Sequence, residues 1–157
     1  MKKLYIVRGL PGSGKSTYAR KLAPLVIEPD MFRYDENNEY VFDSDHNTEV
    51  NRKAYRLCHY AMASLKMPVL AVTAAYIRID KFKPYLSMAR NHGYEVTVVE
   101  CIGSYPNVHN VPEKVIAQMK AEWEMFDEEL ANQEGVSLWS VLCGKTAILY
   151  TPKGDQR

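Results

Sequence analysis

The stretch Ile6–Arg20 reads IVRGLPGSGKSTYAR and contains the pattern G-x-x-x-x-G-K-[ST], which runs from Gly9 to Ser16. A short apolar run precedes the pattern and a helix-like run follows it, as a phosphate-binding loop requires. Glycines let successive backbone N–H groups point inward, and the N-terminus of the following helix adds partial positive charge. The sequence therefore predicts a nucleotide-binding loop made of Gly9, Leu10, Pro11, Gly12, Ser13, Gly14, Lys15, Ser16 and Thr17.

Two side chains of this loop have expected ligands. In loops of this pattern the lysine reaches the β- and γ-phosphates, and the hydroxyl that follows it binds Mg²⁺. We expect these roles for Lys15 and Ser16. The chain has no N-K-x-D motif of the kind that reads guanine, so ATP with Mg²⁺ is the expected ligand.

Short apolar runs alternate with helix-like segments along the chain. The predicted strands are 3–8, 25–27, 69–73 and 94–102, and the predicted helices are 15–22, 47–66, 74–93 and 111–132. This alternation is typical of an α/β domain, a P-loop NTPase here, with a mainly parallel sheet and helices on both faces. Its ligands bind beyond the carboxyl ends of the strands. We expect a single domain over residues 1–157, with 135–157 as a C-terminal β-rich addition.

Composition argues against several classes of protein. The 157 residues include no apolar run near the roughly 18 residues of a membrane span, so no membrane role is expected. The first apolar run ends at Val7, too short for a signal peptide. Three widely spaced cysteines fit reduced thiols better than disulfides or a zinc site. A cytoplasmic location is therefore expected.

Four segments together resemble a known family: RGLPGSGKSTYARKL, IEPDMFR, FKPYLSMARNHGYEVTVVE and NVHNVPEKVIAQMKAEWE. They are similar to the P-loop kinases of the bacteriophage polynucleotide 5′-hydroxyl kinase type and their AAA-labelled and NEDD4-binding-protein-2-like relatives. The resemblance runs from about Lys3 to Trp123. It implies an ATP-dependent kinase that transfers the γ-phosphoryl group to a hydroxyl, most directly the 5′-hydroxyl of a polynucleotide end.

Asp30 and Arg33 follow the second predicted strand and lie three residues apart. In a helical turn they would share one face, where a carboxylate can take the proton of an acceptor hydroxyl and an arginine can hold an acceptor phosphate. The resemblance implies that Asp30 is the general base and that Arg33 holds the 3′-phosphate of a nucleotide. The alternative is a surface ion pair. The expected catalytic residues are Lys15, Asp30 and Arg33, and the expected metal site is Ser16 with Asp30.

Two departures from the resembling family concern catalysis. The third strand ends in Thr73, Ala74 and Ala75, where relatives carry an acid and an amide. The segment 101–112, CIGSYPNVHNVP, has no Arg or Lys, whereas relatives place arginines there. Unless Arg78, Lys81, Lys114 or a neighbouring subunit of an oligomer substitutes for them, we expect slow turnover or a specialised activity.

Two alternatives to a polynucleotide kinase therefore stay open. One is a catalytically weak ATP-binding module that acts through a partner. The other is a small-molecule or mononucleotide kinase, because the segment Glu28–Glu49 carries eight acidic residues and would repel a long polyanion.

A basic group after the third predicted strand has two interpretations. It consists of Arg78, Lys81, Lys83 and Arg90, with Tyr76 and Tyr85 interleaved. Such a mixture can follow a nucleic-acid backbone while a ring stacks on a base. The alternative is a solvated helix face whose tyrosines pack on the sheet.

Overall fold

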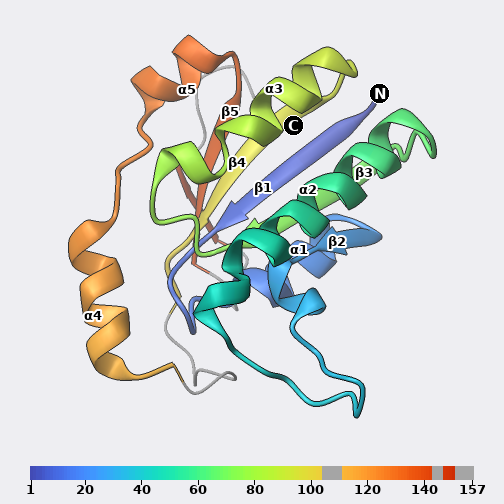
Figure 1. The fold of residues 1–157 in the computed structure, drawn as a ribbon. Helices are drawn as coiled ribbons and strands as arrows, with labels where there is room; N and C mark the ends of the chain where they lie inside the picture. The colour runs from blue at the N-terminus through green and yellow to red at the C-terminus, as the bar shows by residue number, and fades with distance from the viewer. Residues whose placement is uncertain (104–110, 143–146, 151–157) are drawn as a thin grey trace.

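The structure is a computed structural model that describes residues 1–103, 111–142 and 147–150 (Figure 1). Its six strands form one sheet in the order β2-β3-β1-β4-β5-β6. Five strands are parallel and β6 pairs antiparallel with β5. The strands are β1 (Lys3–Arg8), β2 (Leu25–Ile27), β3 (Val69–Ala74), β4 (Glu95–Cys101), β5 (Ser137–Leu142) and β6 (Ala147–Tyr150). The predicted α/β class with a mainly parallel sheet is confirmed.

Helices cover both faces of the sheet. One face packs on α2, α3 and α5 through a core that includes Ile6, Met62, Leu86 and Ala131. The other face packs on α1 through Val7, Ala19 and Val99. The helix α4 buries no residue and stands beside the sheet (Figure 1). The helices are α1 (Lys15–Leu22), α2 (Asn47–Ala63), α3 (Lys83–Asn91), α4 (Glu113–Glu122) and α5 (Glu128–Glu134).

The first elements match the prediction at both ends, and two later helices do not. β1, α1 and β2 have the predicted bounds. The single helix predicted over 111–132 is wrong, because the chain leaves helical conformation at Trp123 and restarts at Glu128, where the Asp127 side chain accepts a hydrogen bond from the Leu130 N–H. The helix predicted from residue 74 begins at Lys83, after a 3-10 turn, η3 (Ile79–Lys81).

Within the described ranges, none of the helices combines the length and the apolar character needed to cross a bilayer. The carboxyl ends of β1, β2 and β3 lie together because these strands are parallel neighbours. The loops that leave these three ends carry the predicted site residues.

Candidate nucleotide-binding and phosphoryl-transfer site

The loop between β1 and α1 has the backbone that the glycine pattern predicts. Gly12 and Gly14 have φ of 80° and 84°, in the left-handed region that favours glycine. A Cβ on Gly9 would lie 2.2 Å from the Ser13 Oγ and 3.0 Å from the Cys101 carbonyl oxygen. No side chain in the described ranges caps the N-terminus of α1 at Gly14. Its first N–H groups therefore remain available to an anion.

Lys15 begins α1 and is half-buried, with the carboxylates of Asp30 and Glu28 near its ammonium group. Burial lowers the pKa of Lys15, while the charges of Asp30 and Glu28 act in the opposite direction. A buried ammonium that faces a cleft can gain the charge-assisted bonds it lacks when phosphate oxygens enter. The loop geometry and Lys15 together fit the triphosphate of a nucleotide.

Asp30 lies in the 3-10 turn η1 (Pro29–Phe32), directly after β2, and Arg33 ends this turn. The Arg33 Nε donates to the Asp30 Oδ1 at 2.7 Å, so the two residues share one face and form the ion pair that the alternative interpretation predicts. The Arg33 Nη2 donates to the Asn47 Oδ1 at 2.7 Å, and its guanidinium lies 5.0 Å from the centre of the Phe42 ring. These contacts fix the orientation of the guanidinium.

The Arg33 side chain is 7% exposed, and its Nη1 has no hydrogen-bond partner among the described residues. A buried donor without a partner is costly, so its presence at the wall of a cleft favours an anionic ligand. Tyr40 lies close by, with its hydroxyl 3.5 Å from the Asp30 Oδ1. Burial and the nearby Asp30 charge raise the pKa of this tyrosine, which keeps it protonated.

A cleft of about 1120 Å³ brings residues of the phosphate loop together with Asp30 and Arg33. Of the predicted residues, those that line it are Pro11, Gly12, Gly14, Lys15, Ser16, Thr17, Asp30 and Arg33. Gly9, Leu10 and Ser13 belong to the loop but do not line the cleft. The polar face of α2 supplies a further wall, formed by Asn47, Thr48, Asn51, Arg52 and Tyr55. The site thus has a phosphate end at the loop and a second end between η1 and α2.

The basic group after β3 is divided between two places. Arg78 and Lys81 line the cleft, and the described part of the protein therefore offers two cations near the third strand. Lys83 and Arg90 instead form ion pairs with Glu134. Tyr76 and Tyr85 are buried at 7% and 5% exposure, so the tyrosines pack in the core as the second interpretation predicts. Most of segment 101–112 lies outside the described residues.

Sequence reasoning missed Arg8, the last residue of β1 and the neighbour of the loop. Its side chain is 0% exposed. Its Nη2 donates to the carbonyls of Tyr76, Ile77 and Glu124 at 2.6, 3.1 and 3.0 Å, and its Nη1 lies 3.1 Å from the Glu100 Oε1. The ring centre of Trp123 lies 3.9 Å from the guanidinium carbon. Arg8 thereby ties β1 to the loop after β3 and to the segment that links α4 with α5.

The Arg8–Glu100 pair is an ion pair held in a buried place. Burial lowers the pKa of Arg8 and raises the pKa of Glu100, and in each case the charge of the partner acts in the opposite direction. The sequence signal for this pair was weak: an arginine that follows the apolar run Leu4–Val7 at the end of β1, and a glutamate one residue before the end of β4.

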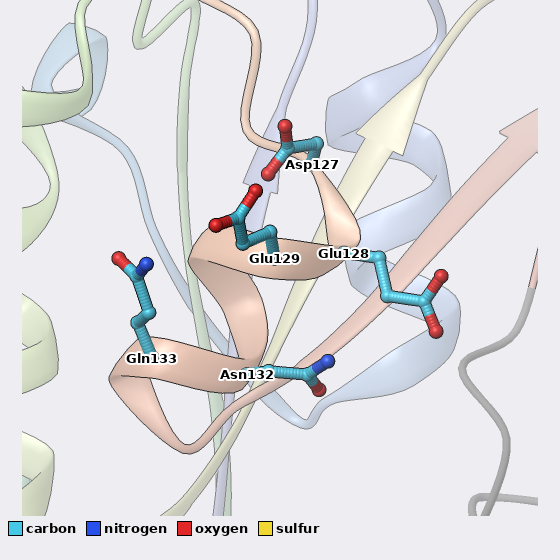
Figure 2. Close-up of a pocket in the computed structure, with 5 residues that line it drawn as sticks. All are labelled: Asp127, Glu128, Glu129, Asn132 and Gln133. Carbon is cyan, nitrogen blue, oxygen red and sulfur yellow. The ribbon is translucent and has the colours of Figure 1, made fainter.

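A second hollow lies at α5 and shares no lining residue with the cleft. Figure 2 shows that Glu128 and Asn132 point to one side of this short helix and Glu129 and Gln133 to the other. The side chains do not converge on a common point, and the described residues contain no group of three or more His, Cys, Asp or Glu able to hold a metal ion. The predicted site residues that line a hollow therefore lie in the cleft and not at α5.

Comparisons with known proteins agree with this geometry. The family described as "AAA domain" matches residues 4–108. Human (Homo sapiens) NEDD4-binding protein 2 is 26% identical over 137 residues, which cover 78% of this chain and 8% of that protein. The chain thus spans less than a tenth of this curated relative.

Solved structures show the same fold at low sequence identity. The AvrRxo1-ORF1:-ORF2 structure with ATP has a TM-score of 0.67 at 12% identity, covering 96% of this chain and 58% of that chain. Kti12 of Chaetomium thermophilum in complex with ADP-AlF3 has a TM-score of 0.62 at 13% identity, covering 90% of this chain and 89% of that chain. The sheet order, the loop after β1 and the match over two-thirds of the chain lead to one conclusion: the protein belongs to the AAA domain family and has a P-loop kinase-like fold.

Proposed function

We propose that residues 1–157 act as a single P-loop kinase-like domain that transfers the γ-phosphoryl group of ATP to a hydroxyl acceptor. The observation that carries the proposal is the shared cleft: the phosphate loop with Lys15 and the Asp30–Arg33 pair line the same hollow. A kinase needs a triphosphate and an acceptor side by side, and a phosphate loop alone would not require the second group.

On the donor side, the backbone N–H groups of residues 9–17 would hold the β- and γ-phosphates and Lys15 would bind their oxygens. The Ser16 hydroxyl would bind Mg²⁺, and Asp30 would help to order the metal through water. The orphaned oxygens in the cleft and the carboxylates around Lys15 fit such a hydrated cation. When bound, the metal neutralises charge on the phosphates.

On the acceptor side, Asp30 would take the proton of the acceptor hydroxyl while the oxygen bonds to the γ-phosphorus. The bond from that phosphorus to the β,γ-bridging oxygen breaks, and ADP is the second product. Arg33 holds Asp30 through Nε and directs Nη1 toward an anionic group of the acceptor. A carboxylate placed in this way orients a poor nucleophile without becoming covalently modified.

The proposed acceptor class is the 5′-hydroxyl of a polynucleotide end, in line with the resemblance of the motifs. An anionic group near the hydroxyl, as a nucleotide 3′-phosphate provides, suits the free Nη1 of Arg33. The reduced state of the buried Cys58 and Cys101 is in keeping with a cytoplasmic location, which is part of the proposal.

A mononucleotide or other small anionic acceptor is the second candidate. The hairpin that follows Arg33, closed by the Tyr34–Tyr40 bridge, carries the exposed acids Asp35, Glu36 and Glu39. These charges lie beside the end of the cleft between η1 and α2, where the acceptor would bind. They disfavour a long polyanion more than a compact one.

Labelled phosphate transfer tests the proposal. The protein is incubated with γ-labelled ATP and Mg²⁺ and offered a 5′-hydroxyl oligonucleotide, a mononucleotide or no acceptor. Asp30→Asn is expected to lower transfer by on the order of 10² to 10⁴, because a general base contributes that much. Asp45→Asn, an exposed carboxylate that does not line the cleft, serves as the matched control. Transfer that survives Asp30→Asn would refute the role of Asp30, and retained ATP binding without transfer to any acceptor would leave a binding module.

A further inference from the structure

Two buried oxygen atoms at the carboxyl ends of neighbouring strands lack a hydrogen-bond partner among the described residues. They are the Glu28 Oε1, directly after β2, and the Thr73 Oγ1, in β3. Ile27 pairs with Val72 in parallel register, and Glu28 keeps an extended backbone with φ of −123° and ψ of 132°. Glu28 and Thr73 therefore sit at the same level of adjacent strands, where side chains emerge on the same face of the sheet.

Both residues line the cleft that contains the phosphate loop. Thr73 is 1% exposed, so its hydroxyl cannot turn to bulk solvent for a partner. The carboxylate of Glu28 lies near the Lys15 ammonium, on which its charge acts. Buried oxygens without partners lower the free energy of unfolding, and folded proteins keep few of them without a ligand or an ordered water. The pair thus marks a place where a bound group supplies hydrogen bonds.

The two carboxylates near Lys15 differ in what they already bind. The Asp30 Oδ1 accepts a hydrogen bond from the Arg33 Nε at 2.7 Å and faces the acceptor end of the cleft. The Glu28 Oε1 has no such bond. Mg²⁺ takes one or two carboxylates at most, keeps several waters and completes its octahedron with phosphate oxygens. Such a cation needs no cage of three acidic or imidazole ligands, and the described residues contain none.

We propose that Glu28 and Thr73 hold the water shell of the divalent cation that accompanies the nucleoside triphosphate, with Ser16 as its direct protein ligand. The inference rests on the proposed function and deepens it. The β3 end, Thr73-Ala74-Ala75, has no carboxylate, and Glu28 on the neighbouring strand supplies one at the same edge of the sheet. Glu28 then joins Asp30 in ordering water on the metal, and Asp30 alone also takes the proton of the acceptor.

The test measures metal affinity directly rather than turnover. Mn²⁺ is titrated into the full chain saturated with AMP-PNP, a nucleotide that is not hydrolysed, and free Mn²⁺ is read by electron paramagnetic resonance. Glu28→Gln is expected to weaken Mn²⁺ binding by on the order of 10- to 100-fold, the usual effect of removing a group that orders metal ligands. Thr73→Val, which keeps the shape of the side chain, is expected to weaken it by a smaller factor in the same direction.

Matched controls and the apo protein separate the outcomes. Glu95→Gln changes an exposed carboxylate at the amino end of β4, and Thr97→Val changes another strand hydroxyl; neither lines the cleft, and neither is expected to alter Mn²⁺ affinity. Thr73→Val is also expected to raise the urea midpoint of the apo protein, since it removes a buried oxygen that lacks a partner. Unchanged Mn²⁺ affinity in both variants, with AMP-PNP still bound, overturns this inference and leaves the proposed function standing. A wild-type chain that binds no AMP-PNP overturns both.

Discussion

Replacing Arg8 by methionine removes the guanidinium that joins three segments of the chain. Methionine retains the apolar stem length but leaves the Glu100 carboxylate buried without its cation and takes the donor from the carbonyls of Tyr76 and Glu124. Breaking one partner of a buried ion pair costs about 3–5 kcal/mol. For a chain of this length each kcal/mol lowers Tm by roughly 2–4 °C. We therefore expect Arg8→Met to lower Tm by about 10 °C.

The loss of folding stability caused by Arg8→Met should also depend on pH. Burial raises the pKa of Glu100, and the charge of Arg8 opposes this rise. Without Arg8 the folded-state pKa of Glu100 rises further, so the folded state binds a proton that the unfolded state releases above a pKa of about 4.3. Stability then falls as pH increases from the unfolded pKa through the folded pKa. The free energy of unfolding that Arg8→Met loses relative to the wild type is thus smaller at pH 5 than at pH 8.

Urea unfolding at these two pH values, followed by circular dichroism, measures the effect. Adding Glu100→Gln to the Arg8→Met variant removes the unpaired charge, so the double variant should recover part of the stability and lose the added pH dependence. Two results would contradict this reasoning. One is a loss of less than about 1 kcal/mol in the free energy of unfolding of Arg8→Met, and the other is a loss that the added Glu100→Gln leaves unchanged. Either would show that the buried ion pair does not contribute the stability assigned to it.

Three further changes test the loop and the last helix. Lys15→Met should raise the urea midpoint of the apo protein, because burial penalises the charged ammonium, and should weaken AMP-PNP binding in calorimetry by roughly 10- to 100-fold. Gly14→Ala should lower Tm, since a left-handed φ costs a residue with a Cβ about 1–2 kcal/mol; an unchanged Tm would contradict the loop conformation. Asp127→Ala should cost about 1 kcal/mol in thermal unfolding, whereas Asp127→Asn, which keeps an acceptor for the Leu130 N–H, should cost less.

Local patterns predicted the first third of the fold because local physics determines it. The glycine spacing sets where β1 ends and where α1 begins, and Pro24 separates α1 from β2. The helix predicted from residue 74 starts late because Tyr76 takes a φ of +46° and its carbonyl accepts two hydrogen bonds from Arg8. The Arg8 side chain lies 68 residues away in sequence, so no local pattern contains this interaction.

The break between α4 and α5 has a similar origin. The Glu124 N–H donates to the Ile77 carbonyl at 2.9 Å, and the Trp123 ring covers the Arg8 guanidinium. These tertiary contacts outweigh the helical pattern of the segment. Motif spacing identified Lys15, Asp30 and Arg33 as candidates, and all three line the cleft. Glu28 and Thr73 were not, because what distinguishes them is a buried oxygen without a partner, which becomes visible only when the neighbouring strands are in place.

The position of β1 in the centre of the sheet determines the order in which the protein can assemble during synthesis. β1 is synthesised before both of its partners in the sheet, β3 and β4, the latter ending at Cys101. At roughly 5–20 residues per second, β1 and the phosphate loop wait on the order of ten seconds for both neighbours. Until β3 is synthesised, β1 has no partner on either side, and until β4 follows it has a partner on one side only. A nascent chain stalled before Cys101 therefore carries the complete nucleotide-binding motif without the sheet that shapes it.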